Sequence, residues 1–246
     1  WWCSDMMNFP TATTVRKRLP KEAFYRHLAL TNALKEKFVS DVDRIMVENS
    51  FTKQTLNLTA SAETKEILLL SVRLKKQEFD GKVTEAIARQ NKHRLVFLLC
   101  FESRRQLALY YGKLYRTPWM EASDVHLSLH GFTLDEIWNS MVEQIALLEE
   151  DASGQNENLS IDERLDRQDR IEKLKMLISR TEAATWRQQQ PKKQFETYTR
   201  LREYQKELEE LERSLAESRK HINEYAYGDN PANGYTSKDE FAQDLQ

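Results

Sequence analysis

Two apolar stretches between residues 66 and 115 dominate the hydrophobic pattern of the chain. In the first, residues 68, 70, 72 and 74 are all apolar, while the alternate positions become polar toward Arg73. This pattern predicts a strand that is buried on both faces at its start and on one face at its end. Residues 94–102 and 107–115 predict two more strands, joined as a hairpin by a tight turn at 103–105. Between them, residues 80–90 carry Val83 and Ile87 at helical spacing and predict a three-turn helix.

The residues before this core leave two interpretations open. Pro20 suits the first turn of a helix, where its missing N–H is not needed. Apolar residues then recur at nearly helical spacing, at Phe24, Leu28, Leu34, Phe38, Val42 and Ile45. The pattern predicts either one amphipathic helix or a helix that changes into a strand near Asp41. Shorter alternating segments at 55–58 and 125–130 predict two minor strands.

An isolated hairpin cannot bury this many apolar residues, so helices must cover the sheet. The expected fold class is therefore α+β, with a small mixed sheet of four to five strands and packed helices over residues 7–150. Thr133 with Glu136, and Ser160 with Glu163, form the pattern of a capping box, which predicts a helix start at each place. Residues 149–160 are polar and contain Gly, Asn and Ser, as in a linker.

The second half of the chain predicts a long helical arm. Pro191 should interrupt it, because proline cannot continue a helix that precedes it. After Pro191 the apolar residues follow an a/d heptad register, at Leu201, Tyr204, Leu208, Leu211, Leu215 and Ile222. Residues 151–227 are thus expected to form an antiparallel helical hairpin or coiled-coil arm, which packs on itself or on another chain. Residues 228–246 hold four acids and one base, and we expect a flexible acidic tail.

Composition narrows the class of protein. The charged fraction of 31% exceeds the roughly 25% of average globular proteins, as expected for long solvated helices. Cys3 and Cys100 lie far apart, and Cys100 falls in an apolar run, so we expect reduced thiols and a cytoplasmic protein. No window approaches the ~18 apolar residues of a membrane span, so no membrane partner is expected.

Positive charge is concentrated in the first half of the chain. Residues 1–130 contain 21 Lys and Arg against 14 Asp and Glu. The candidate nucleic-acid-binding residues form two clusters: Arg16, Lys17, Arg18 and Lys21 before the first helix, and Arg104, Arg105, Lys113 and Arg116 at strand ends, near Arg73, Lys75 and Lys76. Cations on one face bind phosphates, and nearby tyrosines can stack bases. The alternative is a solvated face without a ligand, because the pI of 6.3 is below the value of more than ~9 typical of dedicated binders.

The arm supplies candidate partner-binding residues. Large aromatic side chains anchor many interfaces, and an exposed heptad stripe can pair with another chain. The residues concerned are Trp186, Leu201, Tyr204, Leu208, Leu211, Leu215 and Tyr225.

Several motifs in the first half resemble a known family. They are NFP at 8–10, then Val15, Lys17, Pro20, Lys21, Phe24 and Tyr25, then LKEKF, TLNL, the KEI strand and LYYGKLY. Over roughly residues 7–150 they are similar to the bacterial domain-of-unknown-function family number 4391. Members of that family tend to be encoded near helicases and DNA methyltransferases in restriction-modification or phage-defence clusters. The resemblance implies a helicase or methyltransferase as a partner, and it implies no catalytic residues.

The sequence offers only a few candidate residues for an enzymatic role. A restriction-type, metal-dependent nuclease needs an acid on one strand and Glu-x-Lys on its neighbour. Here Arg73 occupies a position where an acid is needed, so the candidate acids are Asp41, Asp43, Glu66 and Glu102, which alternatively are ordinary surface carboxylates. His126 and His130 would lie ~13 Å apart on a strand, too far to share a zinc ion. The phosphate-binding motifs GxxxxGK and GxGxxG are missing, so neither metal nor cofactor is expected.

The function expected from these observations is non-catalytic. The chain would be an accessory or adaptor subunit of a bacterial DNA-processing or anti-phage defence complex. Its basic α/β domain would contact DNA or a helicase or methyltransferase partner, and its arm would assemble the complex or pair with a second copy. The alternative is a divergent metal-dependent nuclease subunit.

Overall fold

The computed structural model describes residues 7–20, 29–58, 63–147, 159–188 and 190–227, and from residue 215 onward it describes the backbone alone. The chain divides into two compact units, residues 1–153 and 154–246. The expected acidic tail, residues 228–246, lies outside the described residues.

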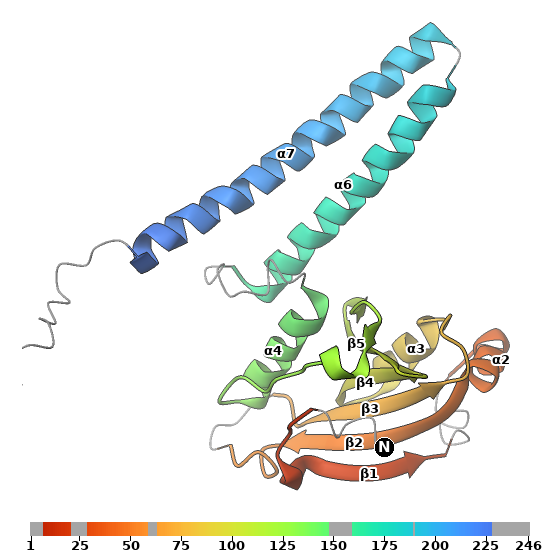
Figure 1. Ribbon diagram of the computed structural model, residues 1–246, viewed down its shortest axis with the longest axis vertical. Coiled ribbons are helices and arrows are strands. Elements are labelled where there is room, and N and C mark those ends of the chain that lie inside the picture. The colour runs from red at the N-terminus through yellow and green to blue at the C-terminus, as the bar shows by residue number, and fades with distance from the viewer. Residues whose placement is uncertain (1–6, 21–28, 59–62, 148–158, 189, 228–246) are drawn as a thin grey trace, which may run out of the picture. The chain divides into compact units, whose positions relative to one another are not determined.

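The described residues of the first unit form a seven-stranded mixed sheet in the order β1-β2-β3-β4-β5-β6, with β7 paired to β5 (Figure 1). The strands are β1 (Thr14–Leu19), β2 (Val42–Thr52), β3 (Glu66–Leu74), β4 (Arg94–Phe101), β5 (Arg104–Tyr111), β6 (Lys113–Arg116) and β7 (Met120–Glu121). Strands β3 and β4 are parallel, and the other pairs are antiparallel. Strands β1, β3 and β4 therefore point in one direction, and β2 and β5 run against them.

Helices cover the sheet because both of its faces are apolar. The helices are α2 (Asn32–Asp41), α3 (Lys82–Gln90) and α4 (Leu134–Ala146), with short 3-10 turns η1 (Thr11–Thr13) and η2 (Ala122–Asp124). On one face, Val72 and Phe97 pack in a core with Phe38 of α2 and Ile87 of α3. We call this the α3 face. The alternate residues, such as Leu69 and Leu98, are also buried and make the opposite face, which α4 covers; we call it the α4 face.

The central prediction is confirmed. Strand β3 is buried along both faces until Arg73, which is exposed. The α+β class with a mixed sheet is confirmed as well, and α3 lies where Val83 and Ile87 predicted it. The segment before the core was predicted to be either one helix or a helix that changes into a strand near Asp41. The second interpretation is confirmed at this point, because α2 stops at Asp41 and β2 begins at the next residue. The earlier part of that predicted helix, residues 21–28, lies outside the described residues.

The prediction of four to five strands was too small. Strand β1 was not predicted, because its sequence, TVRKRL, has no apolar alternation. Five of its six residues are exposed, as in an edge strand. Residues 107–115 are two strands instead of one, since Gly112 has a φ of 70° and turns the chain back on itself. The β4–β5 turn consists of Glu102 and Ser103, so Arg104 and Arg105 belong to β5 and not to the turn.

Two minor strands were predicted wrongly. Residues 55–58 form turns, in which the hydroxyl of Thr55 donates to the carbonyl of Ser50. Residues 125–130 are irregular, although Val125 and Leu127 are buried as their alternation suggested. The side chain of Gln144 bonds both the N–H and the carbonyl of Ser128. A side chain thus replaces the neighbouring strand that this segment would need.

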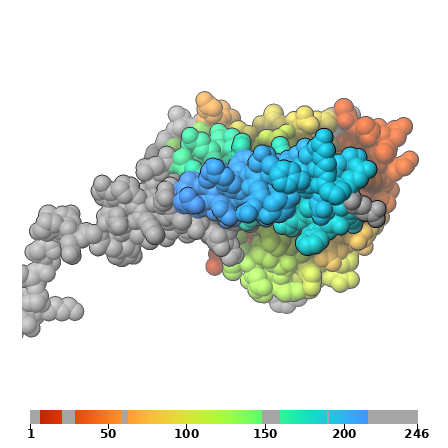
Figure 2. Space-filling model, turned by 90° about the horizontal axis from the view of Figure 1, so that it is seen from above, coloured from red at the N-terminus to blue at the C-terminus, as the bar shows by residue number. Residues whose placement is uncertain are grey.

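The second unit contains helix α6 (Ile161–Arg187) and helix α7 (Pro191–Tyr227), which form a hairpin (Figures 1 and 2). Helix α6 begins with the predicted capping box of Ser160 and Glu163, and Pro191 is the first residue of α7. The two helices contact each other, and the guanidinium Nε of Arg170 lies 2.7 Å from Glu207 Oε1. Leu174 and Leu201 are buried, so part of the predicted heptad seam packs within the chain.

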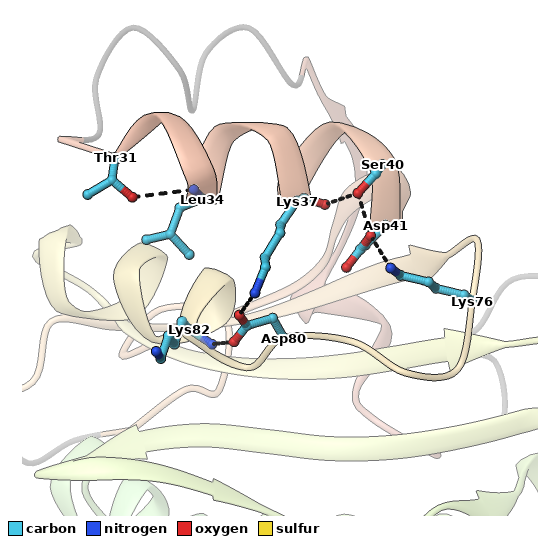
Figure 3. Close-up of polar contacts among 8 residues, drawn as sticks. All are labelled: Thr31, Leu34, Lys37, Ser40, Asp41, Lys76, Asp80 and Lys82. Atoms are coloured by element: carbon cyan, nitrogen blue, oxygen red, sulfur yellow. Dashed lines mark hydrogen bonds and ion pairs between the residues drawn. The ribbon is translucent and has the colours of Figure 1, made fainter.

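Two ion pairs fasten α2 to the connection between β3 and α3 (Figure 3). Lys37 Nζ lies 2.5 Å from Asp80 Oδ2, and Lys76 Nζ lies 2.8 Å from Asp41 Oδ1. The hydrogen bond from Lys37 holds the pKa of Asp80 below its usual value. Burial by itself raises the pKa of Asp41, but hydrogen bonds from Lys76 and Ser40 outweigh it, and the net pKa is lowered. Both carboxylates are therefore more acidic in the folded protein.

Acid should weaken this attachment. Since both pKa values fall on folding, the carboxylates stabilise the protein above the unfolded value of ~3.9, and this contribution is lost as the pH falls through the folded values. At pH 7 the double variant Asp41→Asn/Asp80→Asn should lose about 1–2 kcal/mol of unfolding free energy. The difference from wild type should shrink when urea unfolding is repeated at pH 3. Asp43→Asn, at an exposed residue, is the control, and a difference independent of pH would contradict the assignment.

Candidate nucleic-acid interface

Four arginines lie together at one end of the sheet. The register pairs Arg44 of β2 with Arg73 of β3, Arg73 with Cys100 of β4, and Cys100 with Arg105 of β5. Paired residues point to the same side of a sheet, so these side chains share a face. It is the α4 face, because Arg73 follows Leu69 and Ser71 at alternate positions. Arg18 of β1 pairs with Met46, one step from Arg44 on the same face. We call Arg18, Arg44, Arg73 and Arg105 the arginine row.

The arginine row lies at the carboxyl ends of the parallel strands β1, β3 and β4. Ligands of open α/β sheets bind at this edge. With neighbouring strands about 4.8 Å apart, the row from β1 to β5 spans about 19 Å. Arg18 and Arg73 are exposed, and Arg44 and Arg105 are half-buried. The row is thus wide enough to contact more than one group on a large ligand.

The positive charge of the arginine row is not neutralised by any ion pair among the described residues. In the described part of the chain, the ion pairs involve none of its four arginines. Arg44 faces Arg73 directly across two antiparallel strands, an arrangement of like charges that destabilises a sheet. Arg105 Nη1 donates to the carbonyls of Glu102 and Arg104, while its buried Nε has no partner among the described residues. An anion bound across the row would relieve both the repulsion and the unpaired donor.

The fold places the members of the two predicted basic clusters on different surfaces. Arg18 and Arg105 belong to the arginine row, whereas Arg16 and Lys17 lie on the edge strand β1 outside it. Arg104 pairs with Glu121. Lys113 and Arg116 lie on β6, at the opposite edge of the sheet from β1, so the two predicted clusters are not one surface. Lys21 lies outside the described residues.

One member of the row, Arg44, was missed by sequence reasoning. The pattern of residues 42–45 left helix and strand open, and only a strand places Arg44 beside Arg73. The apolar residues Val42, Ile45, Met46 and Val47 were the available signal, but they do not alternate regularly, and only the pairing with β3 shows which face each side chain takes.

The candidate acids of a nuclease do not converge. Glu66 begins β3 and Glu102 follows β4, and because these strands are parallel the two residues lie at opposite ends, about 30 Å apart. Asp41 is buried and paired with Lys76, and Asp43 is exposed. Across the described ranges, no three His, Cys, Asp or Glu side chains lie close enough to hold a metal ion.

A different acid, Glu48, lies beside the arginine row. Its side chain is 1% exposed and accepts a hydrogen bond from Ser71 Oγ at 2.5 Å. The β2–β3 register shifts between Val47 and Asn49, and this bulge turns Glu48 toward Ser71. Residues Ser71 and Arg73 on β3 occupy the places that Glu and Lys would take in a restriction-type nuclease. The site therefore has one carboxylate where metal chemistry of that type uses two.

The other end of the sheet contains a hollow of about 340 Å³, lined by Glu66, His93, Arg94 and Asp135 among others. The carboxylates of Glu66 and Asp135 are already engaged. Glu66 accepts a hydrogen bond from Ser50 and lies 3.2 Å from His93 Nδ1. Asp135 accepts from the N–H groups of Glu63 and Thr64. Burial alone raises the pKa of Asp135, but the hydrogen bonds lower it overall. These contacts hold the start of β3 in place.

The fold and this site define a class of protein: a mixed-sheet α+β domain with a cationic row at the carboxyl ends of its parallel strands, followed by a helical hairpin. Residues 7–208 match the model of a family described as a domain of unknown function (DUF4391), and the chain belongs to this family. No curated protein and no solved structure matches the chain. Within the described residues, no helix is both long enough and apolar enough to cross a bilayer.

Proposed function

We propose that this protein is a non-catalytic accessory or adaptor subunit that contacts the phosphates of DNA through the arginine row. The observation that carries the proposal is the pair Arg44 and Arg73, which face each other across β2 and β3 without an acidic partner among the described residues. A like-charged pair costs stability unless an anion neutralises it. Arginine suits phosphate because its planar fork donates two parallel hydrogen bonds.

The partner class comes from the family. The resemblance implies helicases and DNA methyltransferases of restriction-modification or phage-defence systems, so we place the subunit in such a bacterial complex. The arm would provide assembly. Tyr204, Leu208 and Leu211 are only half-buried in the hairpin and keep apolar surface for a partner, while the side chains of Leu215 and Tyr225 lie outside the described set.

A metal-dependent nuclease is the second candidate, and the observation that favours it is Glu48. A buried carboxylate facing the neighbouring strand is the first requirement of such a site. Ser71 in place of a second acid counts against it, because a hydroxyl brings no negative charge to offset that of a divalent cation. We therefore rank the nuclease below the binding function.

The proposal predicts measurable, salt-dependent binding of duplex DNA. Fluorescence anisotropy with a short labelled duplex should show an affinity that falls with salt. The slope of log K against log salt should be about −2 to −4, since each neutralised phosphate contributes about −0.9. Incubation of the same duplex with Mg²⁺ or Mn²⁺ should leave it intact. An affinity that salt does not change would contradict the proposal, and cleavage that Glu48→Gln abolishes would establish the nuclease instead.

A further inference from the structure

Three aromatic side chains are exposed where the hairpin turns. Trp186, in the last turn of α6, is 87% exposed, and Phe195 and Tyr198, near the start of α7, are 70% and 47% exposed. Trp186 belongs to the end of α6, and Phe195 and Tyr198 belong to the first turns of α7; these two helix ends meet at the turn of the hairpin (Figure 1). Large rings in water cost free energy, so their exposure needs an explanation. We call residues 179–188 and 190–202 the arm tip.

The arm tip is also basic. It contains six Lys and Arg and two Glu, whereas residues 203–214 contain two bases and five acids. Residues 161–178 hold five bases and five acids, so a net positive charge occurs at the turning end of the hairpin and not in these two neighbouring segments. Arg187, Lys192 and Lys193 lie closest to the turn, and the ion pairs of the described residues involve none of them.

The aromatic and cationic groups alternate on the helix surfaces. Phe195, Tyr198 and Arg202 follow one another at helical spacing on one face of α7, and the Arg202 guanidinium lies 5.7 Å from the centre of the Tyr198 ring. On α6, Arg180 and Arg187 bracket Ala183 and Ala184 around an open hollow of about 450 Å³. Small side chains between two guanidinium groups leave room for an anionic group to reach both.

We propose that the arm tip binds single-stranded nucleic acid, with bases stacked on Trp186 and Phe195 and phosphates held by the neighbouring cations. Single strands expose base faces, and every base can stack on an aromatic ring. A protein partner is less suited, because protein hot spots gather in packed pockets that exclude water. The rings here are individually exposed and lie among cations. This site uses other residues than the arginine row and does not depend on the function proposed for that row.

The test uses the full chain with labelled oligothymidylate, in fluorescence anisotropy. It is carried out in the Arg44→Gln/Arg73→Gln background, so that binding at the arginine row contributes little. Trp186→Ala should weaken binding by about fivefold to a hundredfold, and Trp186→Phe, which keeps an aromatic ring, should stay within about twofold of the parent. Met176→Ala, at another exposed apolar residue of α6, is the matched control and should change nothing.

The same assay separates the alternatives. Polyglutamate should not displace the oligonucleotide at equal charge concentration, because it has no rings to stack. Displacement by polyglutamate would overturn the proposal in favour of an acidic polypeptide ligand. Equal affinity of Trp186→Ala and its parent, or no binding by the parent, would also overturn it. Trp186 is exposed, so circular dichroism should show that each variant keeps its helix content.

Discussion

Replacing Arg44 and Arg73 with glutamine should weaken duplex DNA binding about a hundredfold or more. Each arginine can give a charge-assisted hydrogen bond of roughly 1.5–3 kcal/mol, and about 1.4 kcal/mol corresponds to a tenfold change in affinity. The slope of log K against log salt should become shallower by about 2. Anisotropy with the labelled duplex over a salt series measures both effects.

The same double variant should not lose stability. Glutamine removes two like charges that face each other across β2 and β3. The free energy of unfolding should therefore stay equal or rise by up to about 1 kcal/mol. Urea unfolding measures it. A loss of binding accompanied by a gain in stability is the signature of residues retained for a ligand, whereas a destabilised variant would assign Arg44 and Arg73 a structural role.

Lys113→Gln/Arg116→Gln is the matched control. It removes the same charge from β6, at the opposite edge of the sheet from β1, and should change affinity by less than about threefold. If both double variants weaken binding equally, binding depends on total charge and the arginine row is not the interface.

Phe97→Ala should lower the free energy of unfolding of the first unit by about 3–5 kcal/mol, the usual cost of removing a buried phenylalanine ring. Phe97 is 0% exposed and lies at the centre of the core between β4, α2 and α3. Its neighbours cannot collapse into the space, because strands on both sides hold the sheet in register. Urea unfolding followed by far-UV circular dichroism measures the loss.

Phe132→Ala makes the same chemical change at a residue that is 84% exposed in the same unit. It should cost less than about 0.5 kcal/mol. A similar loss for the two variants would mean that the α3-face core does not dominate the stability of the unit.

The parts of the fold that could be predicted are those whose signal is local. Strand β3 follows from alternating apolar residues and helix α3 from helical spacing, each within about ten residues. The capping box of Ser160 and Glu163 predicts the start of α6. The parts that could not be predicted depend on partners distant in sequence. Strand β1 has no apolar pattern because an edge strand takes its structure from its neighbour β2, and residues 125–130 alternate like a strand although a glutamine side chain takes the place of a partner.

The residues of the candidate site could be predicted only in part, because their neighbourhood depends on strand pairing. Composition and charge indicated a basic first half, and Arg18 and Arg105 were among the candidate residues. The sequence did not indicate that these two residues belong to one surface. Residues 18, 44, 73 and 105 become neighbours only through the pairing of strands that are adjacent in the sheet, and Glu48 turns toward Ser71 only because of a bulge. The sequence by itself therefore determined the elements that have a local pattern, the helical hairpin and the excess of basic residues in the first half of the chain. The tertiary structure decided which charges meet, because strand register is set by side chains that pack from both faces at once.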